Sequence, residues 1–399
     1  MNDVAEKNRK PEIRFTGFTD AWEQREFSST VTRISSVGVK SGLPRVEYED
    51  IVSGRGELNK DIYQKESTKT GIEFDDGDIL FGKLRPYLKN WLLADFKGIA
   101  VGDFWVFRTN ETDNKFIYYL IQTSAYQTAA NQSTGTKMPR SDWNVVSKTD
   151  FNIPTNITEQ TQISTFFKQL DNLITLHQRK YDKLVIVKKS MLEKMFPKAG
   201  ANVPELRFAG STNAWGQRKF SGMYEKVSEK NDLSYGTDRI ISVANMYFKA
   251  DAYISDEEYL RTYNILKLGD IAFEGNKSKN FAYGRFVENT IGDGIVSHVF
   301  DVFRPIIEYD LLFWKYAINN ERLMQSVLIR CTKASTMMTN LVASDFLNEK
   351  FQFPCLEEQK RIGEFFDCLS NLITLNQREL EKLKNIKESM LERMFVWEG

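Results

Sequence analysis

The sequence has very few of the residues that build metal centres, disulfide frameworks and catalytic triads. Its 399 residues include two histidines, His177 and His298, and three cysteines, Cys331, Cys355 and Cys368. The cysteines all lie in the second half and form no C-x-x-C pair, which indicates a reducing compartment and excludes a disulfide framework. Two histidines cannot by themselves supply a zinc site or a Ser/His/Asp triad. We therefore expect no metal site.

Long apolar runs and catalytic motifs are also lacking. No apolar run approaches the roughly 20 residues of a membrane span, and the polar start MNDVAEKNRKPEIRF lacks the apolar core of a secretory signal. We therefore expect a cytoplasmic protein that uses no membrane. A G-x-x-x-x-G-K-[ST] phosphate loop is absent, because GNKS at Gly275 lacks the glycine spacing, and no N-P-P-[FY] motif of amino-methyltransferases is present. These absences argue against catalysis by this chain alone.

The net charge is zero, because 54 Lys and Arg residues balance 54 Asp and Glu residues. This balance argues against a chain that coats nucleic acid by charge alone. It does not exclude a local basic face, because the cationic residues need not be evenly spread.

One long segment occurs twice. FFKQLDNLITLHQRKYDKL begins at Phe166, and FFDCLSNLITLNQRELEKL begins at Phe365, 199 positions later. When residues 157–196 are aligned with 356–395 without a gap, 22 of 40 positions are identical. A second pair, PEIRFTGFTDAWEQREF at Pro11 and PELRFAGSTNAWGQRKF at Pro204, shares 11 of 17 positions. The chain is therefore a duplicated unit.

Both copies of the long segment have apolar residues at intervals of seven, which is typical of a coiled-coil seam. Asn156, three residues before Glu159, indicates a capping box, and Pro197 ends the first segment. Forty residues at about 1.5 Å each form a rod roughly 60 Å long. The apolar rows are Ile163, Leu170, Leu184 and Met191 with Phe167, Ile174, Tyr181 and Met195, and in the second copy Ile362, Leu369, Leu383 and Met390 with Phe366, Ile373, Leu380 and Met394.

One heptad position is polar in both copies. His177 and Asn376 stand where an apolar residue is due. Either both side chains are exposed, or they make a buried polar contact that fixes the register of the helix pair. Neither residue is evidence for catalysis.

The order of the segments predicts how the helices are arranged. Only PKAGANV separates the first long segment from the second P-E-[IL]-R-F, and the first P-E-[IL]-R-F stands near the N-terminus, as if it continued the C-terminal helix. We predict an α+β protein with a pseudo-two-fold cyclic arrangement. Two mixed α/β domains, residues 1–155 and 198–354, are separated by two long antiparallel coiled-coil helices, residues 156–197 and 355–399.

Cationic residues interleaved with aromatic, Ser, Thr and Asn residues follow predicted strands in both globular parts. Such clusters suit DNA, because cations bind phosphates while Arg, Asn and Gln bind base edges. Any one of these residues alone is more often a solvated surface charge, whereas the clusters as a set favour DNA binding. The candidate DNA-binding residues are Lys83, Arg85, Tyr87, Lys89, Lys137, Arg140, Lys277, Lys279, Arg285, Arg330 and Lys333.

Further apolar residues lie off the seam at matching positions of the two long segments. Packing against the chain's own globular domains explains them, and so does the docking of partner helices. The candidate partner-binding residues are Phe166, Leu173, Leu176, Phe365, Leu372 and Leu375.

Two variable domains that alternate with near-identical helices carrying EQ…I…FF..L…NLITL.QR…KL…K.SML..MF resemble the specificity subunit of type I restriction–modification systems. The resemblance covers nearly the whole chain. It implies that each variable region is a target-recognition domain that reads half of a split site in double-stranded DNA. It also implies that the helices set the spacing and dock two methyltransferase subunits.

The same resemblance implies that this chain binds no cofactor itself. S-adenosylmethionine is then expected in the methyltransferase subunits, which methylate adenine, and ATP with Mg in up to two motor-nuclease restriction subunits. The alternative is a scaffold without nucleic acid, in which two divergent modules on a helical spacer bind proteins or glycans.

Overall fold

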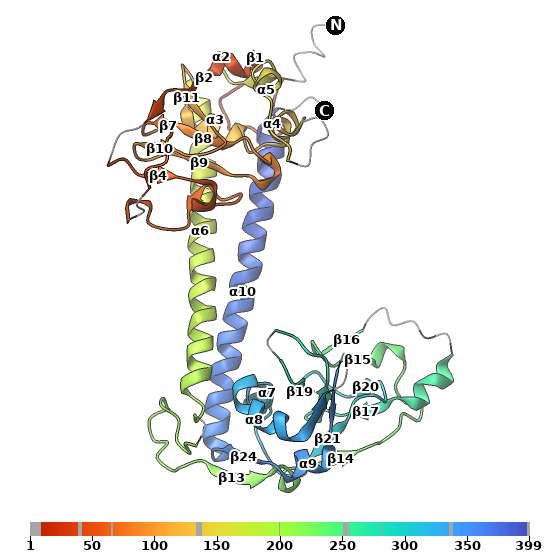
Figure 1. Cartoon of the computed structure of the whole chain (residues 1–399). Coiled ribbons are helices and arrows are strands. Elements are labelled where there is room, and N and C mark those ends of the chain that lie inside the picture. Colours follow the sequence, from red (N-terminus) through yellow and green to blue (C-terminus); the bar gives the residue numbers. More distant parts are fainter. Residues whose placement is uncertain are drawn as a thin grey trace. The chain divides into compact units, whose positions relative to one another are not determined.

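The computed structural model describes residues 9–38, 42–64, 67–132, 138–198, 200–249, 254, 256–279, 281–334 and 338–396. The chain divides into two compact units, Met1–Arg179 with Gln377–Gly399, and Lys180–Asn376. Each unit combines one mixed globular part with half of each of two long helices, α6 (Ile157–Lys194) and α10 (Leu356–Met394) (Figure 1). The predicted fold class is confirmed. No helix within the described ranges is long and apolar enough to cross a membrane.

In the first unit, the N-terminal half of α6 packs antiparallel against the C-terminal half of α10. The rings of Phe167 and Phe395 have centroids 6.0 Å apart. Further along the pair, Ile174 packs in one apolar cluster with Leu380. From Phe167 to Ile174 the contacts move toward the end of α6, and from Phe395 to Leu380 they move back toward the start of α10. The two helix halves therefore run in opposite directions.

The second unit repeats this pairing with the helices exchanged. Phe196, which follows α6, stacks on Phe366 near the start of α10, with ring centroids 6.1 Å apart. One step back along α6, the Lys188 Nζ donates to the Ser370 Oγ over 2.8 Å. In each unit the heptad pattern is therefore used to pair one half of α6 with one half of α10.

The start of α6 is capped as the sequence predicts. The Asn156 Oδ1 accepts from the Thr158 N–H over 2.9 Å. Glu159, predicted to complete a capping box, instead binds Arg14, with the guanidinium Nε and Nη2 donating over 2.6 and 2.9 Å. The repeated Glu therefore joins its helix to the repeated P-E-[IL]-R-F segment.

The second copy makes the same contacts. Arg207 donates to both carboxylate oxygens of Glu358 over 2.9 and 2.6 Å. The Leu206 N–H donates to the carbonyl of Lys194 at the end of α6 over 3.0 Å, and the Ile13 N–H donates to Arg393 O at the end of α10 over 2.9 Å. The N-terminal segment thus follows α10 as the second P-E-[IL]-R-F follows α6, although no peptide bond joins them. This is what the cyclic arrangement predicts.

Each globular part is built on a four-stranded antiparallel sheet, in the order β2-β11-β8-β9 in the first unit and β14-β21-β18-β19 in the second. In both units a short antiparallel pair, β1-β12 or β13-β24, leads the chain in and out of the globular part. A further antiparallel pair, β7-β10 or β17-β20, also recurs.

The elements of the first globular part are β1 (Glu23–Glu26), α2 (Phe27–Thr30), β2 (Val31–Ile34), β3 (Val37–Gly38), β4 (Arg45–Val46), η1 (Tyr48–Asp50), β5 (Ile51–Val52), β6 (Glu57–Leu58), η2 (Ile62–Gln64), β7 (Gly71–Phe74), β8 (Ile79–Gly82), η3 (Pro86–Leu88), β9 (Trp91–Leu93), β10 (Gly98–Ala100), β11 (Phe104–Thr109), α3 (Asn114–Leu120), α4 (Ser124–Asn131), α5 (Trp143–Val146) and β12 (Asp150–Ile153).

Those of the second are β13 (Gly216–Lys219), η4 (Phe220–Gly222), β14 (Tyr224–Val227), η5 (Thr237–Arg239), β15 (Ile241–Ser242), β16 (Tyr247–Phe248), η6 (Glu257–Thr262), β17 (Asn264–Leu266), β18 (Ile271–Glu274), β19 (Arg285–Glu288), β20 (Gly294–Val296), β21 (Val302–Pro305), α7 (Leu311–Ile318), α8 (Glu321–Cys331), β22 (Thr332–Ala334), β23 (Thr339–Leu341), α9 (Ala343–Asn348) and β24 (Lys350–Phe353).

The largest apolar core of each unit joins the sheet to the long helices. In the first unit, Phe81 and Phe107 of the sheet share a core with Phe167 of α6 and Met394 of α10. In the second, residues of β18, β19 and β21 share a core with the end of α6 and the start of α10. The long helices are therefore part of each domain's core as well as a spacer.

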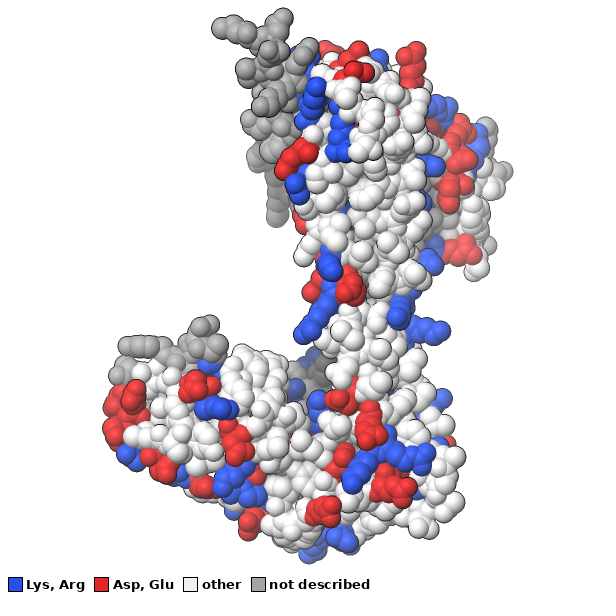
Figure 2. All heavy atoms as spheres, turned by 180° about the vertical axis from the view of Figure 1, so that it is seen from behind, with Lys and Arg blue, Asp and Glu red and all other residues white. Residues whose placement is uncertain are grey.

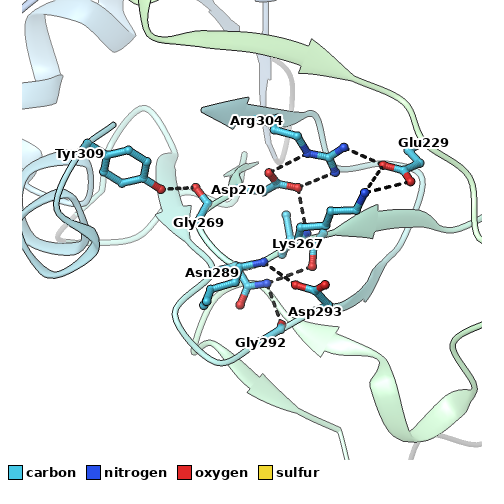
Figure 3. A network of polar contacts seen from close by, with 11 residues as sticks. Glu229, Lys267, Gly269, Asp270, Asn289, Gly292, Asp293, Arg304 and Tyr309 are labelled. Atoms are coloured by element: carbon cyan, nitrogen blue, oxygen red, sulfur yellow. Dashed lines mark hydrogen bonds and ion pairs between the residues drawn. The ribbon is translucent and has the colours of Figure 1, made fainter. Parts of the chain in front are cut away.

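The sequence GDI, at Gly77 and at Gly269, and the sequence VFR, which ends at Arg108 and at Arg304, recur in the two halves, and they form an ion pair in each half. In Figure 3, the Arg304 guanidinium of β21 lies between Asp270, which accepts over 3.1 and 3.0 Å, and Glu229, which accepts over 2.7 Å. In the first unit, Arg108 donates to Asp78 over 2.8 and 2.6 Å. Burial raises the pKa of Asp270, and its bonds from Arg304 oppose that rise. The G-D-I and F-R motifs therefore stabilise the sheet.

One buried side chain of the second unit has no such partner. Glu288 of β19 is 3% exposed, and it has no ion pair among the described residues. The Tyr309 hydroxyl, which donates to Gly269 O over 2.8 Å, and the Lys315 backbone N–H lie close enough to favour its charged form, but neither has good hydrogen-bond geometry to its oxygens. Burial raises the pKa of Glu288 well above 4.5. Its pairing with Ile271 matches the pairing of Leu93 with Ile79, so the first unit has leucine at the equivalent position.

Replacing Glu288 by leucine is expected to raise the free energy of unfolding of the second unit by about 1–3 kcal/mol, because it removes a buried carboxyl that has no ion pair and no well-aligned hydrogen bond among the described residues. The folded state favours the neutral carboxyl. The neutral Glu288 carboxyl leaves the wild type at full stability below the pKa that this group has in the unfolded chain. As the pH rises from there toward the pKa of Glu288 in the folded chain, the wild type loses about 1.4 kcal/mol of stability per pH unit. In urea unfolding, the advantage of Glu288→Leu should therefore grow from pH 5 to pH 7. An advantage that shrinks with pH would contradict this assignment.

Candidate nucleic-acid interface

Two separated segments of the first unit lie side by side and carry several candidate DNA-binding residues. The Arg85 N–H donates to Pro139 O over 2.8 Å, and the Ser141 N–H donates to Lys83 O over 2.9 Å. These backbone bonds place the segment after β8 beside residues 138–141. Lys83 and Arg85 are more than fifty positions away from Arg140 in the sequence. In the structure these three residues form one surface.

An acidic residue that sequence reasoning missed organises this surface. Asp103 accepts from the Arg140 Nη2 over 3.0 Å, and its carboxylate lies 3.8 Å from the Lys83 Nζ. Its carbonyl accepts from the Tyr48 hydroxyl over 2.5 Å, and that hydroxyl accepts from the Leu84 N–H over 3.0 Å. Two cations share one carboxylate, so the surface keeps a positive charge. Asp103 lies in the stretch GDFWVFR, which begins at Gly102, and that stretch was the available signal in the sequence.

Figure 2 shows the charge pattern on one face of the molecule. On that face the Lys and Arg side chains are interspersed with Asp and Glu over the described residues. This agrees with the net charge of zero. On this face the described cations form local groups and no single basic surface.

The second unit brings the corresponding segments together. The Thr339 N–H of β23 donates to Gly275 O over 2.8 Å, so the β22-β23 hairpin lies against the loop that follows β18. Gly275 is required here, because an added Cβ would lie 2.2 Å from Thr339 O. Lys277 and Lys279 on the loop and Lys333 on the hairpin are exposed.

The two arginines of the second set have partners within the unit. Arg285 donates to Glu274 over 2.9 Å and to Ala244 O over 2.8 Å, and its side chain is 21% exposed. Arg330 donates to both oxygens of Glu349 over 2.8 and 2.6 Å, with its side chain 55% exposed. Arg330 thus remains accessible, whereas Arg285 is mainly held by its own unit. Contact of either with DNA stays a prediction.

The remaining candidates of the first unit are spread over exposed positions or lie outside the structure. Tyr87 and Lys89 are exposed at and beside η3. Lys137 lies outside the described residues. Within the described ranges, no group of three or more His, Cys, Asp or Glu residues is placed to hold a metal ion.

The polar heptad positions differ between the two helices. Asn376 is 6% exposed, and its Nδ2 donates to Leu372 O of its own helix over 2.8 Å. His177 is half-buried, and its Nδ1 is buried without a hydrogen-bond partner among the described residues. Asn376 is therefore buried, and a role of the two residues in the helix register stays a prediction.

The off-seam apolar residues divide into two groups. Phe166 and Phe365 are half-buried and pack edge-on against Phe15 and Phe208 of the P-E-[IL]-R-F segments, with ring centroids 6.3 and 6.1 Å apart. The four leucines remain exposed on α6 and α10, by 46, 61, 42 and 56% for Leu173, Leu176, Leu372 and Leu375.

Comparisons with known proteins agree with this architecture. The family model described as "Type I restriction modification DNA specificity domain" matches residues 40–185 and 219–385. The type I restriction enzyme MjaVIII specificity subunit of Methanocaldococcus jannaschii is 23% identical over 346 residues, which cover 80% of this chain and 76% of that protein.

Solved structures share the fold at low sequence identity. The type I restriction–modification S subunit from M. genitalium has a TM-score of 0.56 with 13% identity, over 98% of this chain and 100% of that one. A chain from a structure on complex assembly and conformational transition of the type I R-M system has a TM-score of 0.53 with 16% identity, over 94 and 97%. The family model covers the greater part of both halves, and the chain therefore belongs to the type I restriction–modification DNA specificity family.

Proposed function

We propose that this specificity subunit reads an asymmetric DNA site made of two different short words around an unread gap. The observation that supports this most is that the two units share the same strand order and helix contacts but differ in their loops. Both units share the sheet order, the Asp–Arg pair and the helix contacts. The segments that follow β8 and β18 differ in sequence, yet both carry exposed cations. Each unit then reads one word, and α6 and α10 set the distance between the words.

In this proposal the cationic side chains position the DNA by its phosphates, and the loops read base edges in the major groove. The chain supplies recognition and no chemistry. Two methyltransferase subunits dock on the long helices and bind S-adenosylmethionine for adenine methylation. Up to two restriction subunits, which use ATP and Mg, join the complex for cleavage of unmodified DNA.

The target is tested by sequencing methylated adenines in cells that express this chain with its methyltransferase subunit, against cells without this chain. We expect methylation at two unlike words separated by a constant gap. A palindromic or continuous site would contradict the proposal. A complex that assembles and binds proteins or glycans but selects no DNA would favour the scaffold alternative.

The phosphate contacts are tested by the salt dependence of binding to that site. Lys279→Gln is expected to weaken binding to all sequences alike and to lower the slope of log affinity against log salt by about 0.9, because one phosphate contact is lost. Lys382→Gln, at an exposed lysine of α10 outside both loops, serves as the control and should leave the slope unchanged. An equal slope in wild type and Lys279→Gln would remove Lys279 from the interface.

A further inference from the structure

The turn after β8 in the first unit has an unusual backbone. Arg85 and Lys89, which flank η3, both have left-handed conformations, with φ of 50° and 54°. Residues with a Cβ rarely adopt this conformation, because the side chain approaches the backbone. Such residues persist only where the surrounding structure holds them, and they cluster at functional sites.

Hydrogen bonds on both sides hold this turn in place. Within it, the Leu88 N–H donates to Arg85 O and the Lys89 N–H donates to Pro86 O, each over 2.8 Å. From outside, the Gly54 N–H donates to Lys89 O over 2.9 Å, and Arg85 is bonded to residue 139 as described above. Pro86 is buried, and its ring restricts the backbone further. The turn is therefore rigid before any partner binds.

This rigid turn presents apolar side chains to solvent. Tyr87 is 54% exposed and Leu88 is 39% exposed, and Met138, next to the bonded strand partner, is 55% exposed. Adjacent exposed apolar residues mark an interaction surface. The residues around them are cationic: Lys89 is exposed beside the turn, and Arg140 is 60% exposed on the adjoining segment. An apolar tip between cations is complementary to stacked bases between phosphates.

The second unit does not repeat this tip. In its corresponding loop, Phe281 is half-buried, and the Arg285 guanidinium lies 4.6 Å above its ring. The described loop residues that are exposed are the polar Asn276, Lys277, Ser278 and Lys279 and the small Ala282. Met338 on the adjoining hairpin is 40% exposed, as Met138 is in the first unit, but no exposed aromatic or leucine side chain corresponds to Tyr87 and Leu88. The loop after β8 and the equivalent loop after β18 therefore present different surfaces to DNA.

We propose that Tyr87 and Leu88 form a wedge that enters between two adjacent base pairs and unstacks them, in the half-site read by the first unit only. Apolar side chains that insert at a base step kink the duplex, and the energy of unstacking depends on the step, which adds specificity. Lys89 and Arg140 bind the phosphates on the two sides of the step. This inference rests on the proposed function.

The test uses the full chain with its methyltransferase subunits and a duplex that carries the methylated site. The fluorescent purine analogue 2-aminopurine, which brightens when unstacked, replaces the purines of both half-sites one at a time. Because every base pair contains one purine, every step is sampled. Methyltransferases rotate their target base out of the stack, so brightening at the target adenine of either half-site is assigned to them. At all other positions, we expect the wild type to cause brightening at one step of the first half-site and at none of the second.

The double variant Tyr87→Ala/Leu88→Ala should lose the brightening and bind the site about tenfold more weakly, the size expected from removing one stacked aromatic side chain. Tyr87→Phe, which keeps the ring, should retain both. Tyr63→Ala removes a tyrosine of the same unit that is 69% exposed and belongs to η2 rather than to the turn, and it should change neither. Because the replaced side chains are exposed, the variants should unfold in urea as the wild type does.

Two results would overturn the wedge. One is a wild-type complex that binds the site without brightening in the first half-site, and the other is a double variant that brightens as the wild type does. A wild-type complex that selects no bipartite site would instead contradict the proposed function. Lys89→Gln separates wedge from phosphate contact, because it should lower the salt slope by about 0.9 while the brightening persists.

Discussion

Glu159→Ala is expected to lower the free energy of unfolding of the first unit by about 3–5 kcal/mol, because it leaves a largely buried guanidinium without its partner. Glu159 is 1% exposed and accepts from Arg14 over 2.6 and 2.9 Å and from the Trp22 Nε1 over 3.3 Å. The Arg14 side chain is 13% exposed, so water replaces little of what it loses. Such a loss is a large part of the stability of one domain.

Hydrogen exchange of the first unit measures this effect without assuming that both units unfold together. Glu12→Ala is the matched control. Glu12 lies in the same segment and binds Arg393 in the same two-bonded geometry, over 3.0 and 2.9 Å. That pair is exposed on both sides, so its removal should change protection very little. Equal losses in the two variants would show that burial does not determine the strength of these pairs.

The same contact shows what the sequence reveals and what it leaves out. The repeated Arg14 and Glu159 were visible as parts of two motifs, and Asn156 correctly marked the start of α6. Helix periodicity and caps are local, so a single sequence reports them. The bond between Arg14 and Glu159 joins residues 145 positions apart. A local pattern therefore assigned Glu159 to a capping box, and tertiary structure gave it another partner.

The candidate interface was predictable to a similar extent. Residue type and position after a strand identified Lys83 and Arg140, but not that Asp103 would hold both cations. The same reasoning selected Arg285, because an arginine that binds DNA and one that binds Glu274 are identical in sequence. Only the fold determines which acidic group lies within reach. Accessible cations therefore remain candidates for DNA contact, and Arg285 has a structural role in either case.

Only strand pairing shows which residue of the first unit is equivalent to Glu288. The two globular parts are too divergent for their sequences to be aligned residue by residue. The register of β19 on β18 and of β9 on β8 makes Glu288 equivalent to Leu93. A buried carboxyl without an ion pair is a local cost that the half-buried leucine of the other copy avoids.

The exposed leucines of the long helices carry the largest expected effect on assembly. The double variant Leu173→Asp/Leu372→Asp is expected to weaken binding of the methyltransferase subunits by about 30-fold or more, because charge replaces apolar contacts at the two equivalent positions where we propose that these subunits dock. Leu372 lines a shallow groove of about 340 Å³ with Leu312 and Leu375, which gives a partner side chain a place to pack. Folding should survive, because both leucines are more than 40% exposed.

Size-exclusion chromatography of the co-expressed subunits measures this loss. Ile186→Asp is the control, because Ile186 is 67% exposed on α6 but its equivalent in α10 is Asn385, so it belongs to no repeated surface. The control should elute as the full complex, and the double variant should elute as the free chain. If both elute as the full complex, the repeated leucines are not where the methyltransferase docks. The half-buried pair Phe166 and Phe365 cannot replace them in that role, since their rings already pack on Phe15 and Phe208.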